Sequence, residues 1–210
     1  MGYSTLNRKL GDGYTYYKFY TPNPDGATPY GEETLPAIIA DNQTFGGTDP
    51  SGAEISIERE VLDDEVSQEV GIIQKLIVGE SGMLKLTVEA GKLNNLAIAS
   101  GQRPSAVTNV TQGSIGGSNP GRSLLIGGQI TLDFFGLVHR VCNSVSPNLK
   151  EYLYAPRCQA DPSLCWGYKK NEIRKLELTV NIFPALQDGF VASAACDNRH
   201  ALVQVVFEYV

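Results

Sequence analysis

The chain has 210 residues, 42% of them hydrophobic and 19% charged, and its formal net charge at pH 7 is −6. A chain of this length can bury a substantial core without disulfides or metals, so we expect a single domain over residues 1–210. The charged residues form no basic cluster, which argues against tight binding to the phosphates of nucleic acid. An acidic surface instead repels a duplex and lets it pass without sticking.

No segment has the run of about 18 apolar residues that a membrane-spanning helix needs. The first residues also lack the basic and then apolar pattern of a signal peptide. We therefore expect a soluble protein that is made in the cytoplasm and does not insert into a membrane.

The four cysteines are widely spaced and include no C-x-x-C pair, which argues against a zinc site. They are too few and too scattered for a disulfide framework, so reduced thiols are expected. A local bridge between Cys158 and Cys165 stays open as an alternative in a particle that leaves the cell. The cysteines are Cys142, Cys158, Cys165 and Cys196.

Residues 1–52 are predicted to form an N-terminal arm and loop region, in which an aromatic strand enters a segment rich in turn-forming residues. Two interpretations stay open for the aromatic side chains. They either pack on the core of their own chain or dock on another copy, for which tyrosine is well suited. The candidate inter-subunit residues are Tyr14, Tyr16, Tyr17 and Phe19.

Three segments follow before residue 71. Residues 34–41 are apolar, and Pro36 favours the start of a short strand or an edge strand. Residues 42–52 are rich in turn formers, and Ile55 and Ile57 then alternate with polar residues as in a half-exposed strand. Residues 60–70 are acidic without a basic residue, which predicts a solvated loop or helical turn.

Residues 71–101 give the clearest pattern of the chain. Apolar and polar residues alternate over 72–79 and again over 83–89, with a Gly-containing segment at 80–82 between them. This predicts a β-hairpin with a tight turn at Gly82. The apolar spacing then changes to three and four residues, which predicts a short helix that ends before Gly101.

The next segments are less regular. Residues 102–122 are polar and rich in Gly, Ser and Asn, and they are long enough to indicate a mobile or functional loop. Residues 130–142 alternate as a strand, with a possible bulge at Gly136. Residues 143–170 hold three prolines and the single Trp, Trp166, so we expect an irregular excursion from the sheet.

Two strands close the chain. Residues 175–182 alternate most strictly, with Leu176 and Leu178 on the inward face and Glu177 on the outward face. Residues 201–210 alternate in the same way, and we expect this end of the chain to be part of the sheet.

No set of residues predicts catalysis. The two histidines, His139 and His200, have no partner histidine, and a single His in a strand is more often structural than catalytic. The spacing of Cys196 and His200 lies in a turn and predicts no activated thiolate. We therefore expect a protein that is not an enzyme and that needs no cofactor or metal.

Two motifs, in this order, carry a resemblance to a known family. The first is G-M-L-K-L-T-V-E-A-G-K-L-N-N-L-A-I-A-S-G at 82–101, and the second is K-L-E-L-T-V-N-I-F-P-A-L-Q-D-G at 175–189. Together they make the chain resemble the tail tube, or major tail, proteins of long-tailed bacteriophages. The similarity extends over most of residues 53–210, and segment 143–170 departs from the compact pattern of the family.

The resemblance implies a mainly β fold, a two-sheet β-sandwich or barrel with one short flanking α-helix. It also implies hexameric rings that stack into a hollow tube in the virion tail, assembled in the bacterial host cytoplasm. Viral DNA passes through such a tube without sequence-specific binding. Implied partners are the tape measure, terminator and baseplate or tip proteins, with a sheath in contractile tails.

One polar strand face is expected to line the lumen. The candidate lumen-facing residues are either Lys85, Thr87 and Glu89 or Glu177, Thr179 and Asn181. Two alternatives are kept beside the tube protein. The first is a carbohydrate-binding β-sandwich module that uses Tyr14, Tyr17 and Trp166 as an aromatic platform. The second is a tail terminator or secretion-system ring protein of the same fold.

Overall fold

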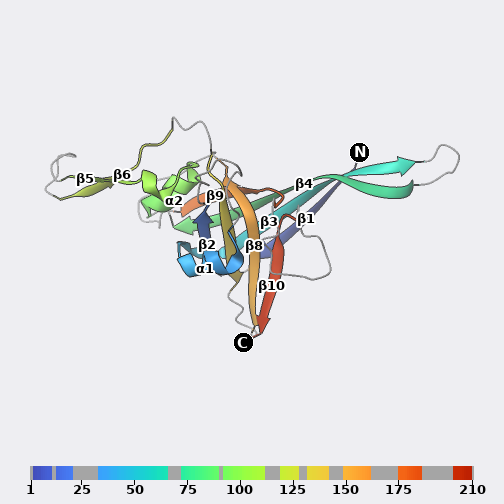
Figure 1. Ribbon diagram of the computed structural model, residues 1–210, viewed down its shortest axis with the longest axis horizontal. Coiled ribbons are helices and arrows are strands. Elements are labelled where there is room, and N and C mark those ends of the chain that lie inside the picture. Colours follow the sequence, from blue (N-terminus) through green and yellow to red (C-terminus); the bar gives the residue numbers. More distant parts are fainter. Residues whose placement is uncertain are drawn as a thin grey trace, which may run out of the picture.

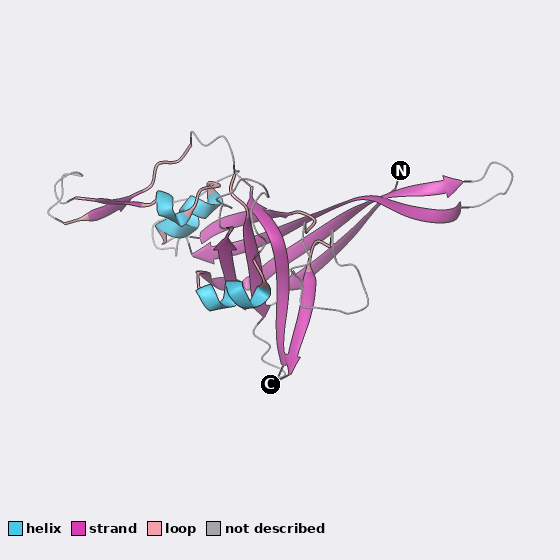
Figure 2. Cartoon of the chain, viewed as in Figure 1, coloured by secondary structure: helices cyan, strands magenta, loops and turns pink. Residues whose placement is uncertain are grey.

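The computed structural model describes residues 2–10, 13–20, 33–65, 72–89, 92–111, 119–127, 132–141, 149–161, 175–185 and 201–209. This part of the chain is mainly β, with a large antiparallel sheet, a small two-stranded sheet and two short α-helices (Figures 1 and 2). None of its helices has the length and apolar character to cross a bilayer. The elements are β1 (Gly2–Leu10), β2 (Gly13–Phe19), α1 (Leu35–Asp41), β3 (Thr44–Glu65), β4 (Ile72–Glu89), α2 (Leu93–Ala99), a 3₁₀ turn (Pro104–Ala106), β5 (Thr108–Val110), β6 (Gly121–Ser123), β7 (Phe135–Val141), β8 (Leu149–Ala160), β9 (Lys175–Ile182) and β10 (Gln204–Tyr209).

The large sheet follows the order β1-β3-β2-β7-β8-β9-β4, and β10 pairs with β8 beside this path. The long strand β3 also pairs with β4, so β3 has β4 along one edge and β1 and β2 along the other. β8 pairs with β7 along one edge. Along its other edge it pairs first with β10 and then, near its end, with β9. The far ends of β3 and β4 extend away from the body on one side, and the β5–β6 hairpin projects on the opposite side (Figure 1).

The core consists of two clusters of buried side chains that lie on opposite faces of β7 and β8. Leu137 and Leu153 belong to the main cluster, which includes residues of β3, β4, β9 and α2. Their neighbours Val138 and Tyr152 belong to the second cluster, which α1 covers with Leu35 and Ile38. Both faces of these central strands are therefore buried, which explains the nearly continuous burial along β7 and β8.

The predictions for β9 and α2 are confirmed. β9 spans Lys175–Ile182, and Leu176, Leu178, Val180 and Ile182 are all buried. α2 is a short helix that is followed by Gly101 with a φ of 81°, in the left-handed region that glycine favours. The side-chain amide of Asn95 donates a hydrogen bond of 2.8 Å to the Phe45 carbonyl and ties α2 to β3.

The predicted hairpin at 80–82 is wrong, because β4 runs without a turn from Ile72 to Glu89. Its partner over this region is β3, with Ser81 opposite Glu58 and Glu80 opposite Arg59. An ion pair of 2.5 Å joins Arg59 to Glu80. The side-chain alternation passes through Gly82, which is buried and supplies space against Ile182 in β9.

Residues 35–41, predicted to form a strand together with residue 34, are helical. Pro36 lies in the first turn of α1, where a missing N–H has no helical partner to lose, so it starts a helix as readily as it borders a strand. The turn-rich segment predicted at 42–52 is a strand from Thr44 onward, and the loop predicted at 60–70 is wrong as far as Glu65, because β3 runs from Thr44 to Glu65. Residues 66–70 lie outside the described residues. The acidic residues after residue 60 are opposite Lys75 and Gln74 of β4.

The predicted excursion at 143–170 is wrong where the structure describes it. β8 occupies 149–160 in the middle of the sheet, and Pro156 is accommodated where the pairing with β7 shifts register at Gly136. The bulge expected at Gly136 is thus confirmed. A Cβ there would come within 2.6 Å of the Ile38 side chain, so glycine lets α1 approach the sheet.

The remaining segments agree in part. Residues 102–122 contain the 3₁₀ turn and both strands of the β5–β6 hairpin. The strand expected from residue 130 begins at Phe135, and Leu132 lies in the loop before it. β10 confirms the last predicted strand and places it in the large sheet. The mainly β class is confirmed, with one large antiparallel sheet and one two-stranded sheet.

Candidate functional site

The two sets of candidate lumen residues lie on one face of two paired strands. β4 and β9 are antiparallel neighbours over eight consecutive residue pairs, from Gly82 opposite Ile182 to Glu89 opposite Lys175. Lys85 is opposite Thr179, and the remaining candidates follow the same register. Because the opposite face of both strands fills the core, the candidates share the solvent side.

Exposure follows this alternation. Lys85 and Glu177 are exposed, and Thr87, Thr179 and Asn181 are half-buried. Glu89 is described only by its place in β4, at the end of this row. The two strands were predicted as separate alternatives, and the pairing of β4 with β9 joins their rows.

β3 adds a third polar row to the same face. Glu54 is opposite Lys85, Ser56 is opposite Met83, and Glu58 is opposite Ser81. β1 continues the sheet beyond β3 and ends with Leu10 opposite Ala53. We call this surface, which is formed by the outward residues of β3, β4 and β9, the polar face.

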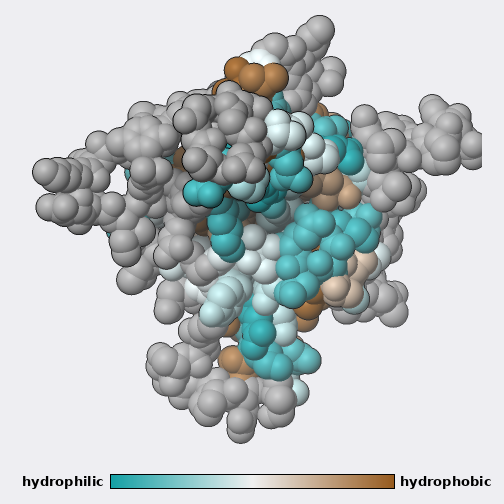
Figure 3. Space-filling model, turned by 90° about the vertical axis from the view of Figure 1, so that its left-hand side faces the viewer, coloured by the Kyte–Doolittle hydropathy of each residue, from teal (hydrophilic) through white to brown (hydrophobic). Residues whose placement is uncertain are grey.

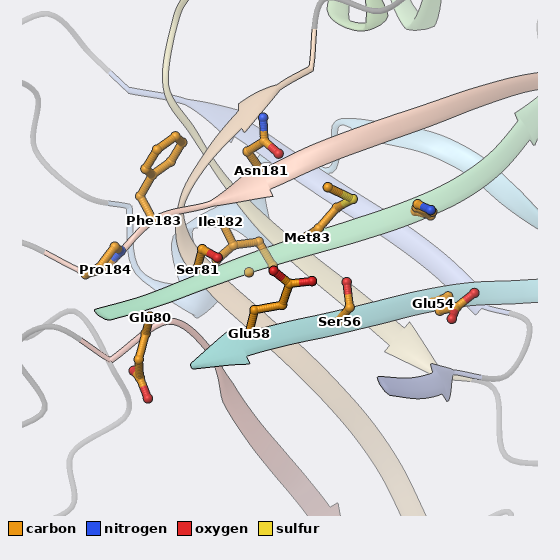
Figure 4. Close-up of a pocket in the computed structure, with 12 residues that line it drawn as sticks. Glu54, Ser56, Glu58, Glu80, Ser81, Met83, Asn181, Ile182, Phe183 and Pro184 are labelled. Carbon is orange, nitrogen blue, oxygen red and sulfur yellow. The ribbon is translucent and has the colours of Figure 1, made fainter. Parts of the chain in front are cut away.

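A groove of about 590 Å³ lies on the polar face. Figure 4 shows Ser56 and Glu58 rising from β3 beside Ser81 and Met83 of β4, with Asn181 behind them on β9. The remaining wall comes from the segment after β9. The residues that line the groove are Glu54, Ser56, Glu58, Glu80, Ser81, Gly82, Met83, Lys85, Asn181, Ile182, Phe183 and Pro184.

The charge of the polar face is mixed with an acidic excess. Among the residues with described side chains, Glu54, Glu58 and Glu177 are negative, and Lys85 and Lys175 are positive. Hydroxyl and amide groups lie between these charges. Such a surface offers phosphates few points of attachment and repels them weakly overall.

The candidate inter-subunit residues of β2 separate into core and surface positions. Tyr17 is only 3% exposed and its ring lies 4.5 Å from that of Phe45, so it serves the core of its own chain. Phe19 is half-buried and packs against the same cluster. Tyr16 is half-buried beside α1, whereas Tyr14 is 49% exposed.

The aromatic platform of the carbohydrate-binding alternative is not assembled by the residues that were proposed for it. Tyr17 is buried, which removes it from the surface, and Tyr14 alternates with it on the opposite face of β2. Trp166 lies outside the described residues. Seen from the side of the β5–β6 hairpin, the described surface is mostly hydrophilic, with small separate hydrophobic areas (Figure 3).

The buried histidine and the buried cysteine have structural surroundings. The Nδ1 atom of His139 lies 2.8 Å from the hydroxyl oxygen of Thr15 on the neighbouring strand, and both residues are fully buried. Cys158 carries a free thiol in the main core, where burial raises the pKa of the thiol. Cys142, Cys165, Cys196 and His200 lie outside the described residues. In the part of the chain that the structure describes, His, Cys, Asp and Glu form no cluster suited to a metal ion.

No protein-family model matches this chain, and no curated protein matches it in sequence.

Proposed function

We propose that this chain is a structural subunit of the tail tube of a long-tailed bacteriophage, which forms hexameric rings that stack into a conduit for DNA. The observation that carries the proposal is the pairing of β4 with β9. The two sequence motifs that resemble the tail tube family lie about ninety residues apart, and their strands are neighbours over eight consecutive pairs. One continuous surface therefore receives its polar residues from both motifs.

The polar face supplies a physical role for that surface. A wall for passing DNA has to be hydrophilic and must not hold phosphates, since each phosphate bound by a basic group slows the passage. The acidic excess of Glu54, Glu58 and Glu177 over the two lysines meets both conditions. In this proposal the polar face lines the lumen, and the core clusters form the body of the wall.

The edges of the large sheet support self-assembly. β1 ends the strand path, and β10 pairs with β8 alone among the described strands. Open edges invite pairing with another chain, and ring closure removes that hazard by pairing the edges with neighbouring copies. The proposed subunit acts by assembly and not by catalysis.

Electron microscopy of the purified full-length chain tests the proposal. Rings or tubes with a central channel are expected after negative staining, and an immunogold label against the chain is expected along the tail of the intact virion. A protein that remains monomeric at millimolar concentration in all solvents refutes the assignment. Isolated single rings that never stack favour a terminator or a secretion-system ring protein in place of a tube subunit.

A further inference from the structure

β10 has an apolar side that is exposed. Val205, Phe207 and Tyr209 are 38%, 49% and 86% exposed, so exposure increases along the strand. Their register partners on β8 include Leu153, which belongs to the main core cluster. This side of β10 therefore continues the core face of the sheet into solvent.

The other side of β10 is fixed to its own chain. Val206 packs against the second core cluster, and the Tyr152 hydroxyl donates a hydrogen bond of 2.8 Å to the Glu208 carboxylate. Lys150 lies 3.7 Å from the same carboxylate. β10 is thus a well-anchored strand that has β8 as its one neighbouring strand among the described residues and presents an exposed apolar side.

β1 is the complementary element. It pairs with β3 through one edge, and the other edge has no strand beside it among the described residues. Its sequence contains Arg8 and Lys9 and no acidic residue. β10, by contrast, contains Glu208 and no basic residue.

On the basis of the function proposed above, we infer that β1 of one copy pairs with β10 of a second copy and joins their sheets. The Glu208 side chain remains 51% exposed beside Lys150, and its charge is opposite to that of Arg8 and Lys9. This complementarity is the reason to choose β1 with β10 over the pairing of two β10 strands. The contact is heterologous, because it joins different surfaces of the two copies, and such contacts form a ring when the rotation between copies closes.

The charges also select the direction of the pairing. If Lys9 stands beside Glu208 and the strands are parallel, all six residues of β10 have partners, from Thr5 beside Gln204 to Leu10 beside Tyr209. In the antiparallel direction the same charge match leaves only three residues of β10 opposite β1. The parallel arrangement is therefore the one inferred.

The core faces of the two copies then coincide. Leu6 and Leu10 of β1 are in register with Ile57 and Ala53 on the core side of β3. The inferred pairing sets these positions beside Val205 and Tyr209, the open apolar side of β10. One copy thus places Leu6 and Leu10, with Arg8 between them, beside the exposed apolar side of β10 in the other copy.

Charge reversal in the full-length chain tests this interface. Glu208→Lys and Lys9→Glu are each expected to abolish rings or tubes in negative stain and to leave a monomer in sedimentation velocity. The combination of both substitutions in one chain is expected to restore assembly, because the pair is regenerated with opposite signs. Asp41→Lys, a matched reversal at an exposed position on α1, is expected to leave assembly unchanged.

The combined variant separates interface from local damage. Glu208→Lys also disturbs the contacts with Tyr152 and Lys150, but Lys9→Glu restores assembly only if the two residues meet across copies. Unchanged assembly in both single variants, or no recovery in the combined one, overturns the β1–β10 contact while the tube proposal stands. A wild-type chain that never assembles overturns both.

Discussion

Truncation of a core leucine in β9, compared with truncation of its outward neighbour, tests the division of this strand into a buried and a wet side. Leu178 is 1% exposed and is opposite Leu86 of β4 in the main core. Leu178→Ala removes three buried carbons, about 2.4 kcal/mol at about 0.8 kcal/mol for each. Incomplete collapse of the cavity raises the expected loss to about 3–4 kcal/mol. Thr179→Ala is expected to cost less than about 1 kcal/mol.

Urea unfolding followed by far-UV circular dichroism measures both losses at one protein concentration. With an m-value of about 3 kcal/mol/M, a loss of about 3 kcal/mol lowers the urea midpoint by about 1 M. The midpoint of Thr179→Ala is expected to move by less than about a third of that. Equal shifts for the two variants contradict the burial pattern of β9, and with it the placement of the polar face.

Four further predictions concern charge, pH, reactivity and backbone contact. Reversal of Glu89 and Glu177 to lysine is expected to slow DNA ejection from assembled particles while tubes still form, because basic groups retain phosphates; unchanged ejection removes these residues from the lumen. Burial, with a smaller contribution from Asp41, raises the pKa of Tyr17 from 10.0 to about 12. As the pH rises, Tyr17 therefore ionises in the unfolded chain before it ionises in the folded chain. The stability that the neutral Tyr17 contributes is complete below pH 10 and is lost between about pH 10 and 12. Urea titrations across this pH range are expected to show no such loss for Tyr17→Phe, and equal pH dependence of stability in the two proteins contradicts the prediction. The Cys158 thiol is buried and has a raised pKa, so it is expected to resist iodoacetamide in the folded chain and to react with it in urea. Peptide mass spectrometry measures this labelling, and rapid labelling of Cys158 in the folded chain contradicts its burial. Gly13→Ala is expected to lower the urea midpoint, because its Cβ would lie 2.1 Å from the Arg140 carbonyl oxygen, and a wild-type midpoint contradicts that close approach.

Local alternation predicted the strands well where one face is buried and the other is wet. β9 and the second half of β4 follow a strict two-residue period, so the bounds of β9, the end of β4 and the buried residues of both could be predicted. The helix α2 was recognisable because the period changed to three and four residues before Gly101. In these segments the tertiary surroundings and the local pattern favour the same structure.

The wrong predictions concern glycine and proline residues. These residues often end strands, but here they lie within a strand or at the start of a helix. Gly82 resembles a turn glycine, yet it lies in a continuous strand because Ile182 occupies the space of its missing side chain. Pro156 resembles a strand breaker, yet it fits at a bulge in β8. Pro36 begins a helix. Each outcome depends on a partner distant in the sequence, which local spacing cannot identify.

The sequence pattern predicted which residues of the candidate site are exposed, but not that they lie on one surface. The alternation assigned Lys85 and Glu177 to wet faces of their strands, and both are exposed. That these faces are one surface depends on the register between β4 and β9, which is a long-range property of the fold. The contribution of Glu54 and Ser56 was missed, although their alternation with Ala53 and Ile55 was the available signal.

The pairing of β10 with one part of the edge of β8 determines how β10 resists a pulling force. All six residues of β10 are paired with β8 in one uninterrupted register. A pull along the length of this strand loads these pairs together in shear, whereas a pull at right angles separates them one after another, as a zipper opens. The strand therefore withstands axial tension far better than peeling.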